Sequence, residues 1–183
     1  RELESITTAL RETETLDPAG GLDGLQVHEK LEEILASPGS AWASLREILA
    51  LLRDALEVDG ALLARVTGNS LEVVESSGID RTGEKEALDL HSLGLDEGSL
   101  TEARLRVEIG QAGRGEVSSR LTIPMLLRGR QHLLYLERNP GSGRAPLGRA
   151  ERNYAMVLAA EITRALDLEA PESDSTHLTD GIA

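Results

Sequence analysis

The chain has 183 residues, a formal net charge of −13 at pH 7, and a composition that is 40% hydrophobic but only 2% aromatic. That size and apolar content suffice for one domain with a real core, which Leu, Val, Ile and Ala must fill because phenylalanine is absent. The absence of cysteine excludes disulfides, thiolate metal sites and thiol catalysis.

The acidity lies at the two ends of the chain. Residues 1–36 carry 9 acidic and 3 basic side chains, residues 167–183 carry 5 and none, and the interval between them carries 18 and 16. Blocks of like charge are typical of solvated linkers and tails. We therefore expect an acidic N-terminal helical or linker segment over 1–38, a domain over 39–168, and a disordered acidic tail or linker over 169–183.

Charge and hydropathy also limit the partners. The nearly neutral central region offers no net basic surface that would displace phosphate counterions, so we expect no nucleic-acid binding by this chain. No apolar run approaches the roughly 18 residues that cross a bilayer, and no signal-peptide pattern is present. We expect a cytoplasmic protein without a membrane partner and, because the first residue is Arg1, a piece of a longer chain.

In chain order, the first expected elements are helices. Residues 1–16 favour a short polar helix, which Pro18 and the following glycines end. A second helical pattern runs from Val27 to Leu35. From Trp42 the apolar residues alternate in steps of three and four, which predicts an amphipathic helix over 41–57 with Ser40 as its N-cap.

Two hairpins and a final helix follow. Strands are expected over 61–66 and 71–76, joined by a turn at Gly68. The pattern weakens from Gly78 to Glu116, where residues 100–109 favour a short helix and then a strand. Residues 120–139 predict a second hairpin around Arg128-Gly129-Arg130-Gln131, and residues 147–166 predict a long Ala-rich helix. This order indicates an α+β fold with five or six antiparallel strands and both long helices packed on one face.

With these residues in view, the chain resembles a GAF domain over roughly Trp42 to Leu166. The resemblance rests on ALEVDGALLARVTGNSLEVVESSGI, TIPMLLRGRQHLLYLERN and AERNYAMVLAAEITRAL. Ile123-Pro124-Met125 and Leu134-Tyr135-Leu136-Glu137 stand where the family has its two strand motifs, whereas His132 replaces a glycine. The resemblance implies a regulatory or sensory module of a bacterial signalling protein, similar to those of enhancer-binding transcriptional activators that carry an FHA domain and an ATPase.

The sequence indicates no catalytic residues, no metal site and no particular cofactor. The four histidines are isolated, without a second ligand at the spacing of a zinc site on one helix face. Residues 110–115 are rich in glycine but do not fit the dinucleotide-binding fingerprint, because a strand pattern follows them. We therefore expect the chain not to be an enzyme.

A small-molecule ligand is expected on the sheet face opposite the helices, beneath residues 78–116. A long connection with little regular structure inside a domain is often a functional lid. Arg106, Arg120 and Tyr135 are the polar candidates at the rim of this site. His132 alternates onto the other face of its strand, and it is the alternative because the sequence does not decide which face holds the pocket.

The final helix carries two apolar tracks, one of which includes Ala155 and Ala159. We expect a homodimer through the helices with these alanines in the seam; the alternative is a helix covered by the sheet and the N-terminal segment. The predicted function is a non-enzymatic regulatory domain that senses a small molecule, mediates dimerisation, or both. The alternatives are a ligand-free dimerisation scaffold and the sensory domain of a histidine kinase or cyclic-nucleotide enzyme.

Overall fold

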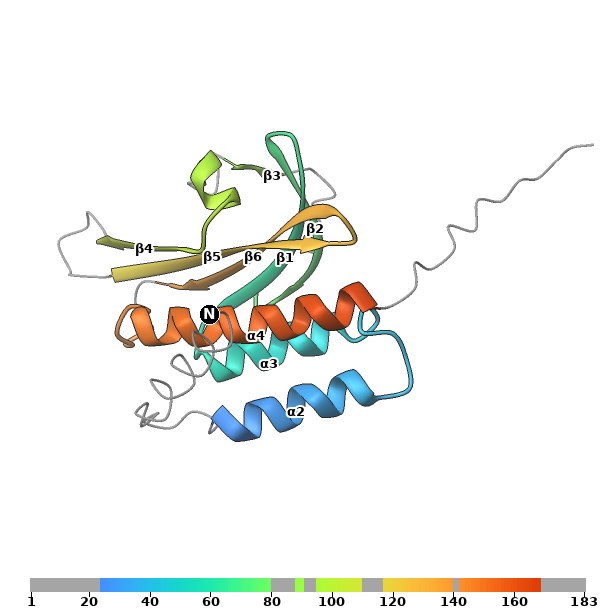
Figure 1. The fold of residues 1–183 in the computed structure, drawn as a ribbon. Coiled ribbons are helices and arrows are strands. Elements are labelled where there is room, and N and C mark those ends of the chain that lie inside the picture. The colour runs from blue at the N-terminus through green and yellow to red at the C-terminus, as the bar shows by residue number, and fades with distance from the viewer. Residues whose placement is uncertain (1–23, 80–87, 91–94, 110–116, 140–141, 169–183) are drawn as a thin grey trace, which may run out of the picture.

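The computed structural model of the chain describes residues 24–79, 88–90, 95–109, 117–139 and 142–168. These residues form a six-stranded antiparallel sheet with three α-helices on one side (Figure 1). The predicted α+β fold with five or six antiparallel strands is confirmed. The helix expected over 1–16 and the tail expected over 169–183 lie outside the described residues.

The sheet has the strand order β3-β2-β1-β6-β5-β4. The strands are β1 (Gly60–Thr67), β2 (Ser70–Ser77), β3 (Leu88–Asp89), β4 (Arg104–Ile109), β5 (Val117–Leu127) and β6 (Arg130–Arg138). The two predicted hairpins are β1-β2 and β5-β6, and the pairing of β1 with β6 joins them at the centre of the sheet.

The two hairpin turns differ in a way that their residues explain. The β1-β2 turn places Gly68 at φ +60°, whereas the β5-β6 turn has positive φ at both Arg128 (+52°) and Gly129 (+69°). A positive φ at the first position alone fits a type II′ turn, and positive φ at both positions fits type I′. The second turn is shorter than the predicted four residues, because Arg130 and Gln131 already belong to β6.

The helices are α2 (Gly24–Ala36), α3 (Leu45–Ala55) and α4 (Arg149–Leu168), with a 3₁₀ helix, η2 (Glu97–Leu100), before β4. Helix α3 begins later than predicted. Ser40 Oγ accepts from the Ala43 N–H at 3.0 Å and so stabilises the preceding turn, while Ser44 is the N-cap position of α3. The prediction of Ser40 as the N-cap of this helix is therefore wrong.

The main core lies between the sheet and the helices. Figure 1 shows α3 and α4 side by side beneath the sheet, with α2 as an outer layer and η2 on the opposite side of the sheet. Val27 and Leu31 of α2 are 0% and 2% exposed, so part of the acidic N-terminal segment contributes to the core. Apolar side chains from the three central strands complete this core: Ala61, Leu63, Leu121, Ile123, Met125, Leu127, Leu134 and Leu136.

Ala155 and Ala159 belong to this core and are 0% and 3% exposed. Their predicted place in a seam with a second copy is therefore wrong. The sequence pattern was misleading because α2 also contacts α4: the Tyr154 hydroxyl donates to the Gly24 carbonyl at 3.3 Å, and His28 Nδ1 lies 3.1 Å from Glu161 Oε2. Two apolar tracks on α4 are thus accounted for within one chain.

Arg138 joins three segments at the end of β6. This side chain is 6% exposed, and its guanidinium donates to the carbonyls of Leu56 at 2.7 Å, Glu57 at 3.2 Å, and Ala145. Glu57 has a φ of +49° just after α3, so the arginine satisfies the carbonyls at a sharply turned helix end.

Replacing Arg138 with Met would leave the Leu56 and Ala145 carbonyls without this donor, whereas Arg144 would still donate to the Glu57 carbonyl at 2.7 Å. Because an unsatisfied buried acceptor costs about 1–3 kcal/mol, we expect Arg138→Met to lower the free energy of unfolding by about 3 kcal/mol in urea denaturation. Lys30 is exposed on α2, and Lys30→Met is the control, with an expected effect within about 0.5 kcal/mol. Equal effects of the two substitutions would contradict this role.

Candidate functional site

Strand β6 divides the predicted site residues between the two faces of the sheet. Tyr135 packs with Leu62 and Leu133 on the face opposite the helices, which we call the outer face. His132 points to the helix side, where its ring lies 6.2 Å from that of Trp42. The expected alternation is therefore present, and Tyr135 and His132 cannot line the same site.

Arg106 and Arg120 share the outer face with Tyr135. They are directly opposite each other in the β4-β5 register, and Thr122, two residues after Arg120, pairs with Tyr135. Like charges directly opposite each other in a sheet are destabilising. Two carboxylates reduce this repulsion: Glu108 lies 3.5 Å from Arg120, and Asp96 lies 3.7 Å from Arg106.

Asp96 organises the centre of this group. It caps η2 by accepting from both the backbone N–H and the hydroxyl of Ser99, and both its oxygens accept from Arg104 Nη1 at 3.0 Å. The Ser99 hydrogen bonds, with smaller contributions from Arg104 and Arg106, lower the pKa of Asp96 below its ordinary value. Asp96 is therefore an ionised partner that orients two neighbouring arginines.

The sequence alone does not single out Asp96 or Arg104. The spacing of Asp96 and Ser99 is a recognisable helix-capping signal, but the contact with Arg104 depends on how η2 folds back over β4. Gly98 permits this close approach, since a Cβ there would lie 2.0 Å from the Arg104 guanidinium.

Next to these charged groups the outer face is apolar. A second buried cluster covers the central strands there: Leu62, Ala64, Leu71, Leu90, Leu95, Leu133 and Tyr135. The Tyr135 hydroxyl donates to Glu137 Oε2 at 2.9 Å, so the ring lies in the apolar cluster while its polar end meets the charged group. An apolar floor beside several arginines has the composition of a site for a small anionic molecule.

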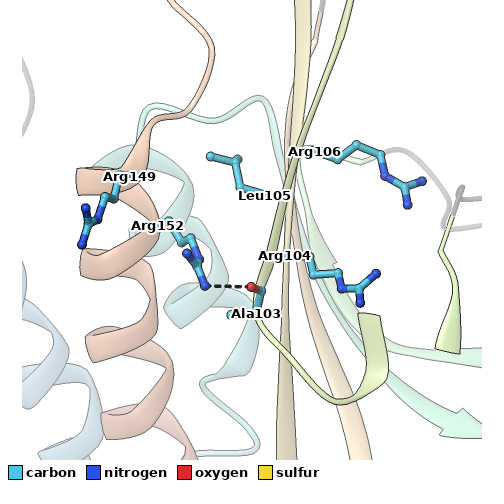
Figure 2. A pocket seen from close by; sticks show the side chains of 6 residues that line it. All are labelled: Ala103, Arg104, Leu105, Arg106, Arg149 and Arg152. Atoms are coloured by element: carbon cyan, nitrogen blue, oxygen red, sulfur yellow. Dashed lines mark hydrogen bonds between the residues drawn. The ribbon is translucent and has the colours of Figure 1, made fainter. Parts of the chain in front are cut away.

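An open hollow of about 560 Å³ lies at the β4 edge of the sheet, lined by Ala103, Arg104, Leu105, Arg106, Arg149 and Arg152. Figure 2 shows that Arg104 and Arg106 extend from β4 on the side away from α4, whereas α4 supplies Arg149 and Arg152. Arg152 Nη2 donates to the Ala103 carbonyl at 3.0 Å, and Arg152 Nε is buried without a hydrogen-bond partner among the residues that the structure describes. We call this feature the edge hollow.

His132, the alternative site residue, is part of a contact between β6, the turn before α3, and the end of α4. It is 5% exposed, and its Nδ1 lies 3.0 Å from the Arg130 carbonyl. Trp42 stacks beneath the Arg128 guanidinium at 5.0 Å and donates from its indole N–H to the Leu166 carbonyl at 3.2 Å. His132 thus packs in the helix-side core, away from the outer face.

Within the described residues, no group of three or more His, Asp or Glu side chains is placed to hold a metal ion. No helix in the same part of the chain has the length and apolar character needed to cross a membrane.

Several solved structures share the fold. The GAF domain of a phosphoenolpyruvate-protein phosphotransferase from Coxiella burnetii matches with a TM-score of 0.59 and 15% identity, over 80% of this chain and 94% of that one. The corresponding domain from Acinetobacter matches with a TM-score of 0.57 and 16% identity, over 78% of this chain and 91% of that one. A phycoerythrobilin-bound GAF domain from a cyanobacterial phytochrome matches with a TM-score of 0.53 and 12% identity, over 80% of this chain and 95% of that one.

These matches establish that the chain has the GAF fold, as the resemblance of its sequence motifs implied. No protein-family model matches the sequence, and no curated protein matches it. The solved structures are related to this chain through their architecture, at low sequence identity.

Burial makes His132 sensitive to pH. Desolvation lowers the pKa of His132 below the ordinary value of 6.5. The hydrogen bond to the Arg130 carbonyl opposes this shift, and the positive charges of Arg65 and Arg130 add to it. As the pH falls, the unfolded chain therefore binds a proton at this histidine at a higher pH than the folded protein does. The stability that neutral His132 contributes is complete above pH 6.5 and is lost as the pH falls through the lower folded-state pKa.

We expect the free energy of unfolding to decrease more between pH 7.5 and pH 5.5 in the wild type than in His132→Gln, which cannot be protonated at this position. Urea denaturation of both proteins at the two pH values measures the difference, and the variant serves as the control for all other titrating groups. An equal decrease in both proteins would mean that the surroundings of His132 do not lower its pKa.

Proposed function

We propose that this chain is a non-enzymatic regulatory domain of a cytoplasmic bacterial signalling or transcription-regulatory protein, and that it binds a small anionic molecule on the outer face. The observation that carries the proposal is the convergence of Arg104, Arg106 and Arg120 beside a buried apolar cluster on one face of the sheet. A GAF domain of similar fold, from a cyanobacterial phytochrome, holds phycoerythrobilin.

The ion pairs on the outer face are suited to exchange. Arg106 and Arg120 lie 3.7 and 3.5 Å from their carboxylate partners, and about half of the Asp96 and Glu108 side chains is exposed. Exposed ion pairs of this kind contribute only about 0–1 kcal/mol. A ligand carboxylate or phosphate that binds an arginine through two parallel hydrogen bonds can therefore replace them.

One observation favours a second function, that of a scaffold without a ligand. Leu90 and Leu95 are buried against the outer-face cluster, and the Tyr135 hydroxyl is already paired with Glu137. In this alternative the side chains of the chain itself fill the site. The further alternatives, a domain of a histidine kinase or of a cyclic-nucleotide enzyme, differ in the effector domain rather than in these residues.

We also propose dimerisation through the helices. The proposed contact surface is the outward side of α4 and not the side with Ala155 and Ala159. Since Ala155 and Ala159 are internal, the outward side of α4 is formed by Met156, Ala160 and Arg164. Met156 is 41% exposed and supplies apolar area on this side.

For ligand binding, we expect at least one member of a panel of nucleotides, haem and small organic acids to shift the amide resonances of Arg106, Arg120 and Leu133. The double substitution Arg106→Gln and Arg120→Gln should weaken that binding at least about tenfold, because two charge-assisted hydrogen-bond donors are lost. Arg164→Gln is the matched control on the far side of the molecule. If no compound perturbs these amides, the scaffold alternative replaces the sensor.

For dimerisation, we expect Met156→Glu to convert a dimer into a folded monomer, because it places a charge in an apolar contact without entering the core. Light scattering of the eluting protein reports the mass, and circular dichroism reports the fold. Lys30→Glu, on the exposed side of α2, is the charge control. A wild-type protein that is monomeric at high concentration would exclude the dimer.

A further inference from the structure

The outer edge of β4 presents backbone groups to solvent. In the described sheet β4 is the last strand, paired only with β5. The Arg104 carbonyl faces β5, since it accepts from Thr122 Oγ1 at 3.4 Å, whereas the Ala103 carbonyl faces α4 and accepts from Arg152. Backbone direction alternates along a strand, so the N–H and C=O groups of Leu105 and Val107 also face outward.

The edge hollow lies beside these outward groups. Arg149 and Arg152 of α4 have no carboxylate within ion-pair distance among the described residues, whereas Arg104 and Arg106 both contact Asp96. Arg152 Nε is buried and has no acceptor in the described part of the chain, and Val107 is 47% exposed. An unpaired strand edge beside two unneutralised arginines fits an extended segment with acidic side chains.

Residues 1–23 have the required chemistry and the required attachment point. They contain 6 acidic and 2 basic side chains, and they precede Gly24. The Gly24 carbonyl accepts from Tyr154, which is two residues from Arg152 on α4. Residues 169–183 are also acidic, but they follow the other end of α4, and a helix of 20 residues is about 30 Å long.

The order of residues within this segment matches the geometry of the edge. In Glu12-Thr13-Glu14-Thr15, the carboxylates alternate with β-favouring threonines, so an extended backbone places both carboxylates on one side. Their separation is about 6–7 Å, close to the 5–6 Å between helix positions three apart, such as Arg149 and Arg152.

We propose that the acidic segment of residues 1–23 adds as a strand along the outer edge of β4, with Glu12 and Glu14 bound to Arg149 and Arg152. Considered alone, residues 1–16 favour a short helix; pairing with β4 supplies the hydrogen bonds that favour the extended form instead. Arg104 and Arg106 of the outer-face site belong to the same strand. A segment bound along the edge of β4 would therefore contact the strand that holds these two arginines.

The absence of cysteine from the chain permits a direct test. A nitroxide attached to Thr13→Cys in the full ¹⁵N-labelled chain should remove most of the amide intensity of Leu105 and Val107 at low salt. This loss should disappear when Glu12→Gln and Glu14→Gln are added, and also when Arg149→Gln and Arg152→Gln are added. Unchanged spectra of β1 and β6 establish that each variant is folded, and the glutamate pair leaves the described fold untouched.

A nitroxide at Thr176→Cys is the matched control in the other acidic segment, and it should leave Leu105 and Val107 unaffected. Four results would overturn the proposal: no loss of intensity from Thr13→Cys, the same loss after the Glu12 and Glu14 substitutions, loss from Thr176→Cys instead, or helical Cα shifts for residues 12–15. Loss that arises only between a labelled and a separate ¹⁵N chain would assign the edge to a second copy and would also overturn it.

Discussion

The antiparallel pairing of β1 with β6 is the contact on which the other features depend. It joins the two hairpins and aligns Leu62 with Tyr135 and Leu63 with Leu134, so that one row of side chains meets the helices and the next row meets the outer face. A shift of one residue in this register would exchange the two faces. Burial of apolar side chains on both faces fixes the register, and the register in turn decides that Tyr135 joins the arginine group while His132 does not.

The hairpins and the long final helix could be predicted because their signals are local. Alternating apolar residues, the glycines of the two turns and the helical spacing after Leu147 lie within short stretches of sequence. The contact of Asp96 with Arg104 could not be predicted, because it depends on the path of the chain through η2. The burial of Ala155 and Ala159 could not be predicted without the contact between α2 and α4. The start of α3 could not be predicted either, because the Ser40 side chain stabilises the turn before the helix and not the helix itself.

The two proposals assign separate roles to the two sides of strand β4, whose residues alternate in direction. The side chains of Arg104 and Arg106 reach Asp96 on the outer face, while the Ala103 carbonyl just before the strand accepts from Arg152 of α4 and the backbone groups of Leu105 and Val107 face outward. A small ligand on one side and a peptide segment on the other would thus act on the same six-residue strand. A coupling between them requires only that the edge partner alters how rigidly β4 holds its arginines.

The β5-β6 turn touches the end of α4 through its main chain. The Arg128 N–H donates to Asp167 Oδ1 at 2.5 Å, and the turn reaches this position with Arg128 and Gly129 both at positive φ. Every residue except proline has a backbone N–H, so this hydrogen bond does not require a particular side chain at position 128. The hydrogen bond between the turn and the helix therefore depends on the acceptor at 167 and on the glycine at 129, whereas the Arg128 side chain contributes separately, through its contact with Trp42.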